Sequence, residues 1–128
     1  MKLTDIHGMD ILWEGLVDDQ SCVVYANLTE ANTARVGFGQ NTKGGVIRGI
    51  AGNIITNPVL AGLAAGFAVD AVKKYMNNKS KTTQFFAKDH REREMYRKVV
   101  DDLMKTGKYR KTKDKYVPGG YLWELRLI

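Results

Sequence analysis

The sequence has very little cysteine, proline and histidine. Cys22 is the single cysteine of 128 residues, so no disulfide can form within one chain, and Pro58 and Pro118 are its two prolines. His7 and His90, even together with Cys22, fall short of a structural zinc set. We therefore expect no metal and no cofactor, and we interpret Cys22 as a small apolar residue buried in a strand.

Recognisable sets of catalytic residues are lacking as well. Asp5, His7 and Asp10 lie close in sequence, but near a chain end such residues are ordinarily solvated polar side chains. The glycine-rich stretch 37–45, GFGQNTKGG, lacks the order of a phosphate-binding loop, because Lys43 precedes two glycines and no hydroxyl residue follows the lysine. The sequence predicts no enzyme and no small-molecule substrate.

A secretory signal is not recognisable at the start of the sequence. Asp5, Asp10 and Glu14 interrupt the first fifteen residues, where a signal peptide would carry an uninterrupted apolar run. We expect no signal peptide and a location in the cytoplasm or within an assembled particle.

Charge is present in both signs but is distributed unevenly. The formal net charge is +6 and 44% of residues are hydrophobic, which suits one folded domain spanning residues 1–128. Residues 1–30 hold six carboxylates against one lysine, a net of −5, whereas residues 73–115 hold fifteen lysines and arginines against six carboxylates, a net of +9. The domain divides into an acidic strand region (1–40), a Gly/Ala-rich helical region (44–76) and a basic helix plus hairpin (82–128).

The acidic region has the alternation of β-strands. Residues 11–16 and 22–25 alternate around the polar stretch 18–21, which predicts a hairpin. A third strand is expected at 33–38, with Ala34, Val36 and Phe38 on one side.

The Gly/Ala-rich region carries 21 uncharged residues between Arg48 and Asp70, enough for a membrane span by length alone. Asn57 followed by Pro58 divides this run, because asparagine caps a helix and proline suits its first position. We expect a short element at 46–56 and a helix from Pro58 to about Tyr75.

Two glycine pairs in this region have the G-x-x-x-G spacing that allows a second backbone to come close: Gly45 with Gly49, and Gly62 with Gly66. On the central helix the spacing predicts a bulky face and a slimmer one. The bulky face is Leu60, Leu63, Phe67 and Ala71, and the slim face is Gly62, Ala65, Gly66 and Val69. We interpret the four glycines as a self-association site, with a buried central helix and membrane contact as alternatives.

The basic region begins with a strongly predicted helix. Asp89 and Glu92 have capping-box spacing, and Gly107 suits the end of the helix. Its inward stripe is expected to be Met95, Val99, Val100, Leu103 and Met104.

A C-terminal hairpin is expected to turn at residues 118–120. On its second strand the core face should be Tyr121, Trp123, Leu125 and Leu127. Strict alternation on the first strand places Lys108, Arg110, Thr112 and Asp114 on one side and Tyr109, Lys111, Lys113 and Lys115 on the other. Basic residues on both sides suit a solvated sheet edge. As an alternative, nucleic acid or an acidic partner would bind Lys108, Arg110, Lys111, Lys113 and Lys115, with Tyr109 and Tyr116 stacking on bases.

Together these elements predict an α+β fold. A small antiparallel sheet, formed by the N- and C-terminal hairpins, would pack on the Gly/Ala-rich central helix and on the second, charged amphipathic helix. The function expected first is a non-enzymatic, self-associating assembly protein, such as a structural component of a phage-type virion, whose partners are copies of itself or neighbouring subunits. The alternatives are a nucleic-acid-binding module using the basic hairpin and a membrane-active protein that inserts residues 44–72.

Overall fold

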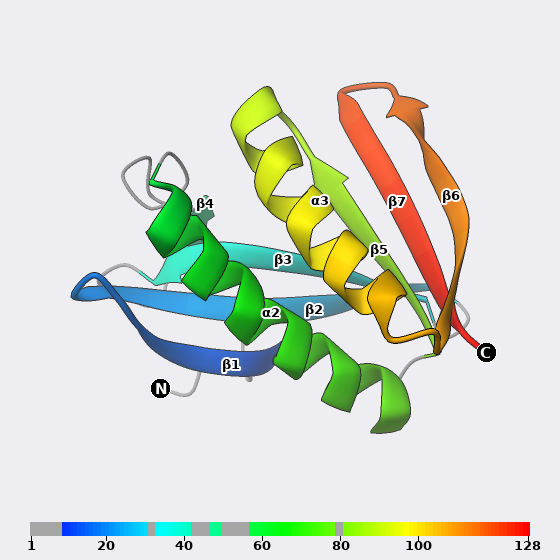
Figure 1. Cartoon of the computed structure of the whole chain (residues 1–128), viewed down its shortest axis with the longest axis horizontal. Coiled ribbons are helices and arrows are strands. Elements are labelled where there is room, and N and C mark those ends of the chain that lie inside the picture. The colour runs from blue at the N-terminus through cyan, green and yellow to red at the C-terminus, as the bar shows by residue number, and fades with distance from the viewer. Residues whose placement is uncertain (1–8, 31–32, 42–46, 50–56, 79–80) are drawn as a thin grey trace.

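The computed structural model describes residues 9–30, 33–41, 47–49, 57–78 and 81–128. These residues form an α+β fold, as predicted, with two helices on one face of a mixed, mostly antiparallel sheet (Figure 1). The elements are β1 (Met9–Val17), β2 (Gln20–Glu30), β3 (Thr33–Asn41), β4 (Ile47–Gly49), α2 (Pro58–Asn78), β5 (Thr82–Ala87), α3 (His90–Lys105), β6 (Tyr109–Val117) and β7 (Gly120–Leu127). The strand order is β1-β2-β3-β5-β7-β6, and the short β4 pairs with β3.

The N-terminal hairpin forms as predicted. Asp18 and Asp19 both adopt positive φ angles, 52° and 60°, and together they form the tight turn between β1 and β2. On β3, Ala34, Val36 and Phe38 are buried together in the core, which confirms the side predicted for them.

The central helix begins where the sequence predicts. The side-chain oxygen of Asn57 accepts hydrogen bonds from the backbone N–H groups of Val59 at 3.0 Å and Leu60 at 3.3 Å, and Pro58 is the first helical residue. The helix continues to Asn78, past the predicted end near Tyr75. Among the described residues, no helix has the length and apolar content needed to cross a membrane.

The predicted division of α2 into a bulky and a slim face is wrong. Leu63 is 49% exposed and Gly62 and Gly66 are exposed, whereas Ala65 and Val69 of the predicted slim face are buried. Alanine dominates the buried side because small side chains let α2 lie close to β1 and α3. Aromatic rings fill the rest of the space between α2 and the sheet: the ring of Trp13 on β1 stacks on the ring of Phe67, with 4.5 Å between the ring centres.

Strand β5 was not predicted from the sequence. It pairs in parallel with β3, from Thr33 opposite Thr82 to Val36 opposite Phe85, and antiparallel with β7. A parallel pair needs a long crossover connection, and α2 lies within the connection from β3 to β5. The sheet is therefore mixed rather than antiparallel, and β3 and β5 together connect the β1–β2 hairpin to the β6–β7 hairpin in one sheet, as Figure 1 shows.

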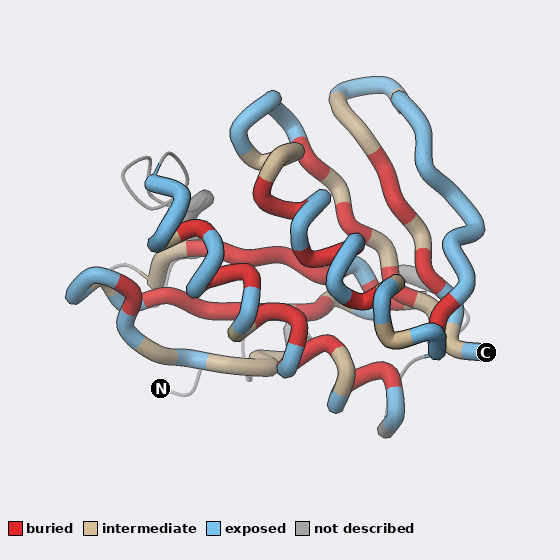
Figure 2. Tube along the Cα trace, in the orientation of Figure 1, coloured by how far each residue is buried: buried red, intermediate tan, exposed pale blue. Residues whose placement is uncertain are grey.

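Helix α3 also matches its predicted ends. The carboxylate of Asp89 accepts from the Glu92 backbone N–H at 2.9 Å, and Gly107 takes a positive φ of 73° after the last turn. The buried stripe includes Tyr96, which was not predicted, while Met104 is only partly buried. Figure 2 shows buried and exposed residues alternating along α3.

The C-terminal hairpin turns at Gly119, and β6 lies at the edge of the sheet as expected. The strict alternation predicted for its first strand is wrong, because the register shifts between Lys111 and Lys113. This bulge at Thr112 moves every later residue to the opposite face. Lys113 and Lys115 therefore share a face with Arg110, while Asp114 and Tyr116 face the helices with Lys111.

Candidate functional site

The face of β3, β5, β7 and β6 that points away from the helices is the candidate site, and we call it the outer sheet face. Cross-strand register places its side chains, because residues directly opposite each other share a face. The described side chains that cross-strand register places on this face include Thr33, Arg35, Thr82, Gln84, Phe86, Arg110, Lys113, Lys115, Val117, Leu122, Glu124 and Arg126, and the Thr112 hydroxyl at the bulge reaches the same face. Five of them carry positive charge and one carries negative charge.

The bulge in β6 brings two of these five cations, Lys113 and Lys115, onto the outer sheet face. Without it, Lys113 and Lys115 would point toward the helices; with it, they join Arg110, which lies opposite Arg126 of β7. Of the five basic residues predicted to bind nucleic acid or an acidic partner, the outer sheet face thus brings together three. Lys111 points to the helix side, where its ammonium pairs with the Asp114 carboxylate at 3.0 Å, and Lys108 precedes the strand.

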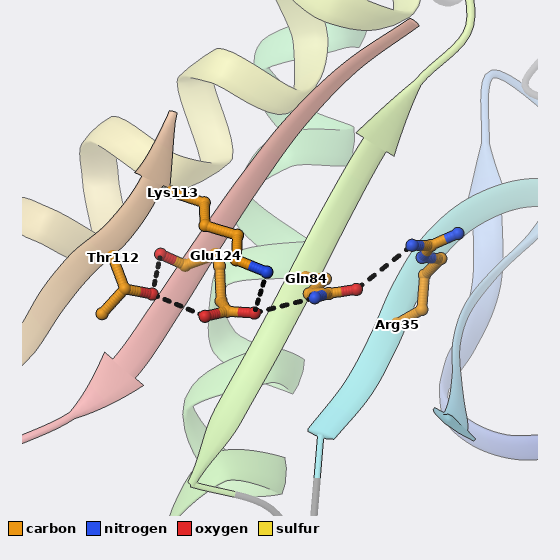
Figure 3. A network of polar contacts seen from close by, with 5 residues as sticks. All are labelled: Arg35, Gln84, Thr112, Lys113 and Glu124. Atoms are coloured by element: carbon orange, nitrogen blue, oxygen red, sulfur yellow. Dashed lines mark hydrogen bonds and ion pairs between the residues drawn. The ribbon is translucent and has the colours of Figure 1, made fainter. Parts of the chain in front are cut away.

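A polar network crosses all four strands of the outer sheet face (Figure 3). Arg35 donates to the Gln84 side-chain oxygen at 3.1 Å, and the Gln84 amide donates to the Glu124 carboxylate at 2.7 Å. From β6, the Thr112 hydroxyl donates to the same carboxylate at 2.7 Å, and the Lys113 ammonium lies 3.7 Å from it. The network fixes the relative positions of Arg35 and Lys113 at opposite ends of the face.

The electrostatics of Glu124 follow from this network. Partial burial acts to raise its pKa, but hydrogen bonds from Gln84 and Thr112 and the charge of Lys113 outweigh burial, so the pKa lies below its ordinary value. Glu124 is therefore ionised at neutral pH and offsets one cation of the face. In the part of the chain that the structure describes, no carboxylate forms an ion pair with Arg110, Lys115 or Arg126.

Sequence reasoning missed Arg35, Phe86 and Arg126 as members of this face. The Arg35 guanidinium lies over the Phe86 ring, 5.5 Å from its centre, and these residues come from β3 and β5. The position of Arg126 on this face could have been predicted, because Arg126 alternates in the sequence with the predicted core residues of β7. The contact between Arg35 and Phe86 could not, because it depends on β5, which the sequence did not predict, lying beside β3.

The tyrosines predicted to stack on bases lie elsewhere. Tyr109 is buried in the core, so its ring is not available to a ligand. Tyr116 is 70% exposed but faces the helix side, where the Arg93 guanidinium donates to its hydroxyl and lies over its ring. Tyr116 therefore attaches the hairpin to α3 and is not part of the outer sheet face.

The glycines predicted to support self-association lie in different surroundings. Around Gly62 and Gly66 the space is open, because a Cβ built on either would meet nothing within 4 Å. They share the exposed side of α2 with Leu63 and with Val59, which is 78% exposed. Gly49 lies in β4 opposite Gly39, so helical spacing does not apply to it, and Gly45 lies outside the described residues.

Acid–base and metal chemistry have little support from the described residues. Cys22 is buried, and burial raises the pKa of its thiol, which disfavours the nucleophilic thiolate. Over the described ranges, no three His, Cys, Asp or Glu side chains are grouped so that they could hold a metal ion.

Comparisons with known proteins add no assignment. No protein-family model, no curated protein and no solved structure matches this chain. The class that the described residues define is the α+β fold.

Proposed function

We propose that the outer sheet face binds single-stranded nucleic acid. The observation that carries the proposal is the cluster of Arg35, Arg110, Lys113, Lys115 and Arg126 on one face, with Glu124 as the only carboxylate among its described residues. Contacts between such cations and phosphates supply most of the affinity of proteins for nucleic acid.

The shape of the surface favours a single strand over a duplex. A sheet face is too broad to enter a groove, whereas the unstacked bases of a single strand can lie on it and stack on exposed rings. Phe86 supplies a partly exposed ring on this face, with Arg35 stacked over it.

The experiment is a titration of a labelled oligodeoxythymidylate, followed by fluorescence anisotropy over a range of salt concentrations. The double variant Arg110→Gln with Lys115→Gln removes two cations that pair with no described carboxylate. The slope of log affinity against log salt should fall by about 1.4, since each phosphate contact with a single strand contributes about 0.7.

The matched control is Lys98→Gln with Lys105→Gln, which removes two exposed cations from α3 on the other side of the molecule. This control should leave affinity and salt slope unchanged. An equal loss in both double variants contradicts the assignment to the outer sheet face. Absence of binding at low salt, or equal competition by polyglutamate, contradicts nucleic-acid binding itself.

A second candidate function is self-association through the exposed side of α2. Glycine within a helix costs about 0.5–1 kcal/mol relative to alanine, and neither Gly62 nor Gly66 is compensated by a contact within the described chain. A second copy of this chain, close to the exposed Val59 and Leu63, would provide the compensating contact. A virion or similar assembly, and head-to-tail pairing of the acidic and basic regions, remain predictions that depend on this contact.

Sedimentation at several protein concentrations tests self-association. Gly66→Leu places a large side chain where the second backbone would lie, so the expected result is a shift from oligomer to monomer. Lys98→Leu, at an exposed position of α3 and outside the exposed side of α2, is the control. A monomer at every concentration removes this candidate function.

Membrane insertion of residues 44–72 also stays a prediction. The buried side of α2 packs in the core through Ala64, Ala68 and Val72, so insertion of this helix into lipid would remove those side chains from the core. Flotation with liposomes tests it, and a protein that stays in the unfloated fraction contradicts it.

A further inference from the structure

A cleft lies where β3 and β5 diverge. The two strands run parallel as far as Val36 and Phe85, after which β3 continues beside β2 and β4 while β5 ends at Ala87. The cleft has a volume of about 430 Å³, within the range of small-molecule sites, and the first half of α3 forms part of its wall through Glu92 and Tyr96. Ligands of sheets with parallel strands commonly bind at the carboxyl ends of those strands, which is the position of this cleft.

Where β3 leaves β5, the backbone N–H of Phe38 on β3 needs a hydrogen-bond acceptor other than β5. The Phe38 N–H donates to the buried Tyr96 hydroxyl at 3.0 Å. Burial raises the pKa of Tyr96 well above its ordinary value, so the hydroxyl keeps its proton. Its oxygen accepts from Phe38, and Tyr96 lines the cleft, so we infer that its O–H is left to donate to a ligand.

The upper walls combine aromatic surface with hydrogen-bonding groups. The Tyr25 ring lies directly over Gly37, where a Cβ would come within 2.4 Å of the ring, so glycine is required for this ring position. Phe86 lines the cleft from β5, and Asn27 adds an amide that can both donate and accept. Burial, and to a lesser degree the charge of Glu92, raise the pKa of Tyr25, which keeps this hydroxyl a donor as well.

Among the described residues that line it, the cleft has one carboxylate and two cations. Glu92 accepts a hydrogen bond from the Lys88 backbone, and burial followed by the nearby charge of Asp89 raises its pKa. The two cations that line the cleft are Arg35 and Lys88. Arg35 and Phe86 belong to both the cleft and the outer sheet face, so the two surfaces are continuous.

We propose that this cleft binds one nucleobase of a strand lying on the outer sheet face, with Arg35 and Lys88 contacting the adjoining phosphate. The proposal rests on the proposed function and names a recognition site within it. The rings of Tyr25 and Phe86 suit a flat aromatic ligand. The donors of Tyr25 and Tyr96 and the amide of Asn27 suit the polar edge of a base, and the cations suit its phosphate.

The test titrates the protein with each deoxynucleoside 5′-monophosphate, and separately with inorganic phosphate, by calorimetry and by amide chemical shifts. We expect at least one nucleotide to bind, with shifts at Gly37, Lys88 and Glu92 that inorganic phosphate does not reproduce. Tyr25→Leu should weaken nucleotide binding by about five-fold or more, which is the lower end of what one base–aromatic stack contributes. Tyr116→Leu, an exposed tyrosine outside the cleft, is the matched control and should have no effect.

Asn27→Ala provides a second variant in case Tyr25→Leu does not fold. It should weaken binding unequally among the nucleotides, because it removes contacts to the edge of the base. Nucleotide binding that neither variant weakens overturns the proposal, and so do identical shifts with inorganic phosphate.

The oligonucleotide titration distinguishes failure of the cleft proposal from failure of the proposed function of the outer sheet face. If the oligonucleotide binds with strong salt dependence but no mononucleotide binds and Tyr25→Leu is neutral, the cleft proposal fails while the outer sheet face keeps its function. If mononucleotides bind and the oligonucleotide does not, the cleft is a free-nucleotide site and the proposal as stated is overturned. If neither binds, both proposals fail.

Discussion

Two glycines of this molecule differ in how closely other atoms approach them. Gly66 and Gly120 are the same residue type, but Gly66 has free space around it and Gly120 does not. A Cβ at Gly66 would meet nothing within 4 Å, whereas a Cβ at Gly120 would lie 2.1 Å from the carbonyl oxygen of Ala87. Gly120 is therefore needed for the close pairing of β7 with β5, whereas Gly66 has no such role among the described residues.

The same substitution should therefore change stability in opposite directions at these two positions. Gly66→Ala should raise the free energy of unfolding by about 0.5–1 kcal/mol. Alanine lowers the conformational entropy of the unfolded chain, and in the folded helix its methyl group meets no neighbouring atom. Gly120→Ala should lower it, because the backbone of β5 has to shift. Urea denaturation at a protein concentration where the chain is monomeric measures both. A loss of stability at Gly66 would contradict the open surroundings described for it.

At the scale of elements, the network centred on Glu124 connects β3, β5, β7 and β6 while opposing the charge of the outer sheet face. The fold and the proposed binding of nucleic acid therefore favour different residues at position 124. The carboxylate of Glu124 accepts hydrogen bonds that stabilise the sheet, whereas its negative charge would repel the phosphates of the proposed ligand.

Glu124→Gln should separate these two effects. The lowered pKa of Glu124 means that its ionised form stabilises the fold above the pKa of the unfolded chain, and that this contribution is lost as pH falls through the lower, folded-state pKa. The variant should thus be less stable than the parent at neutral pH, with the difference shrinking in acid, and it should bind oligonucleotide more tightly. Denaturation curves across pH and the anisotropy titration measure the two effects. Equal stability at neutral pH together with unchanged affinity would contradict the role given to this network.

The sequence predicts elements well where the signal is local. Asn57 and Asp89 cap their helices because the hydrogen bonds reach only two or three residues along the chain. Thr82–Ala87 was missed because a six-residue strand between two helices is defined by its partners β3 and β7 and not by its own short pattern. The bulge at Thr112 was missed for the same reason, since a register shift is a property of two strands.

At the scale of the whole molecule, the two layers separate two kinds of surface. On the helix side, α2 has an exposed side, visible in Figure 2, where Gly62 and Gly66 lie with Val59 and Leu63; this is the surface proposed above for self-association. On the other side, the outer sheet face and the cleft beside it carry cations and rings. Part of this outer site was predictable: Arg110, Lys113 and Lys115 were identified as basic residues of an exposed strand. Their gathering on one face, and the pairing of Arg35 with Phe86, depend on the mixed sheet and could not be read from composition or spacing.

Amide chemical-shift mapping with an oligodeoxythymidylate tests the central claim most directly, because one titration reports on every described surface at once. The account predicts shifts along β3, β5, β7 and β6 and around the cleft at Gly37 and Lys88, with none along the exposed sides of α2 and α3. Shifts confined to the helices, or no shifts at low salt, would contradict it.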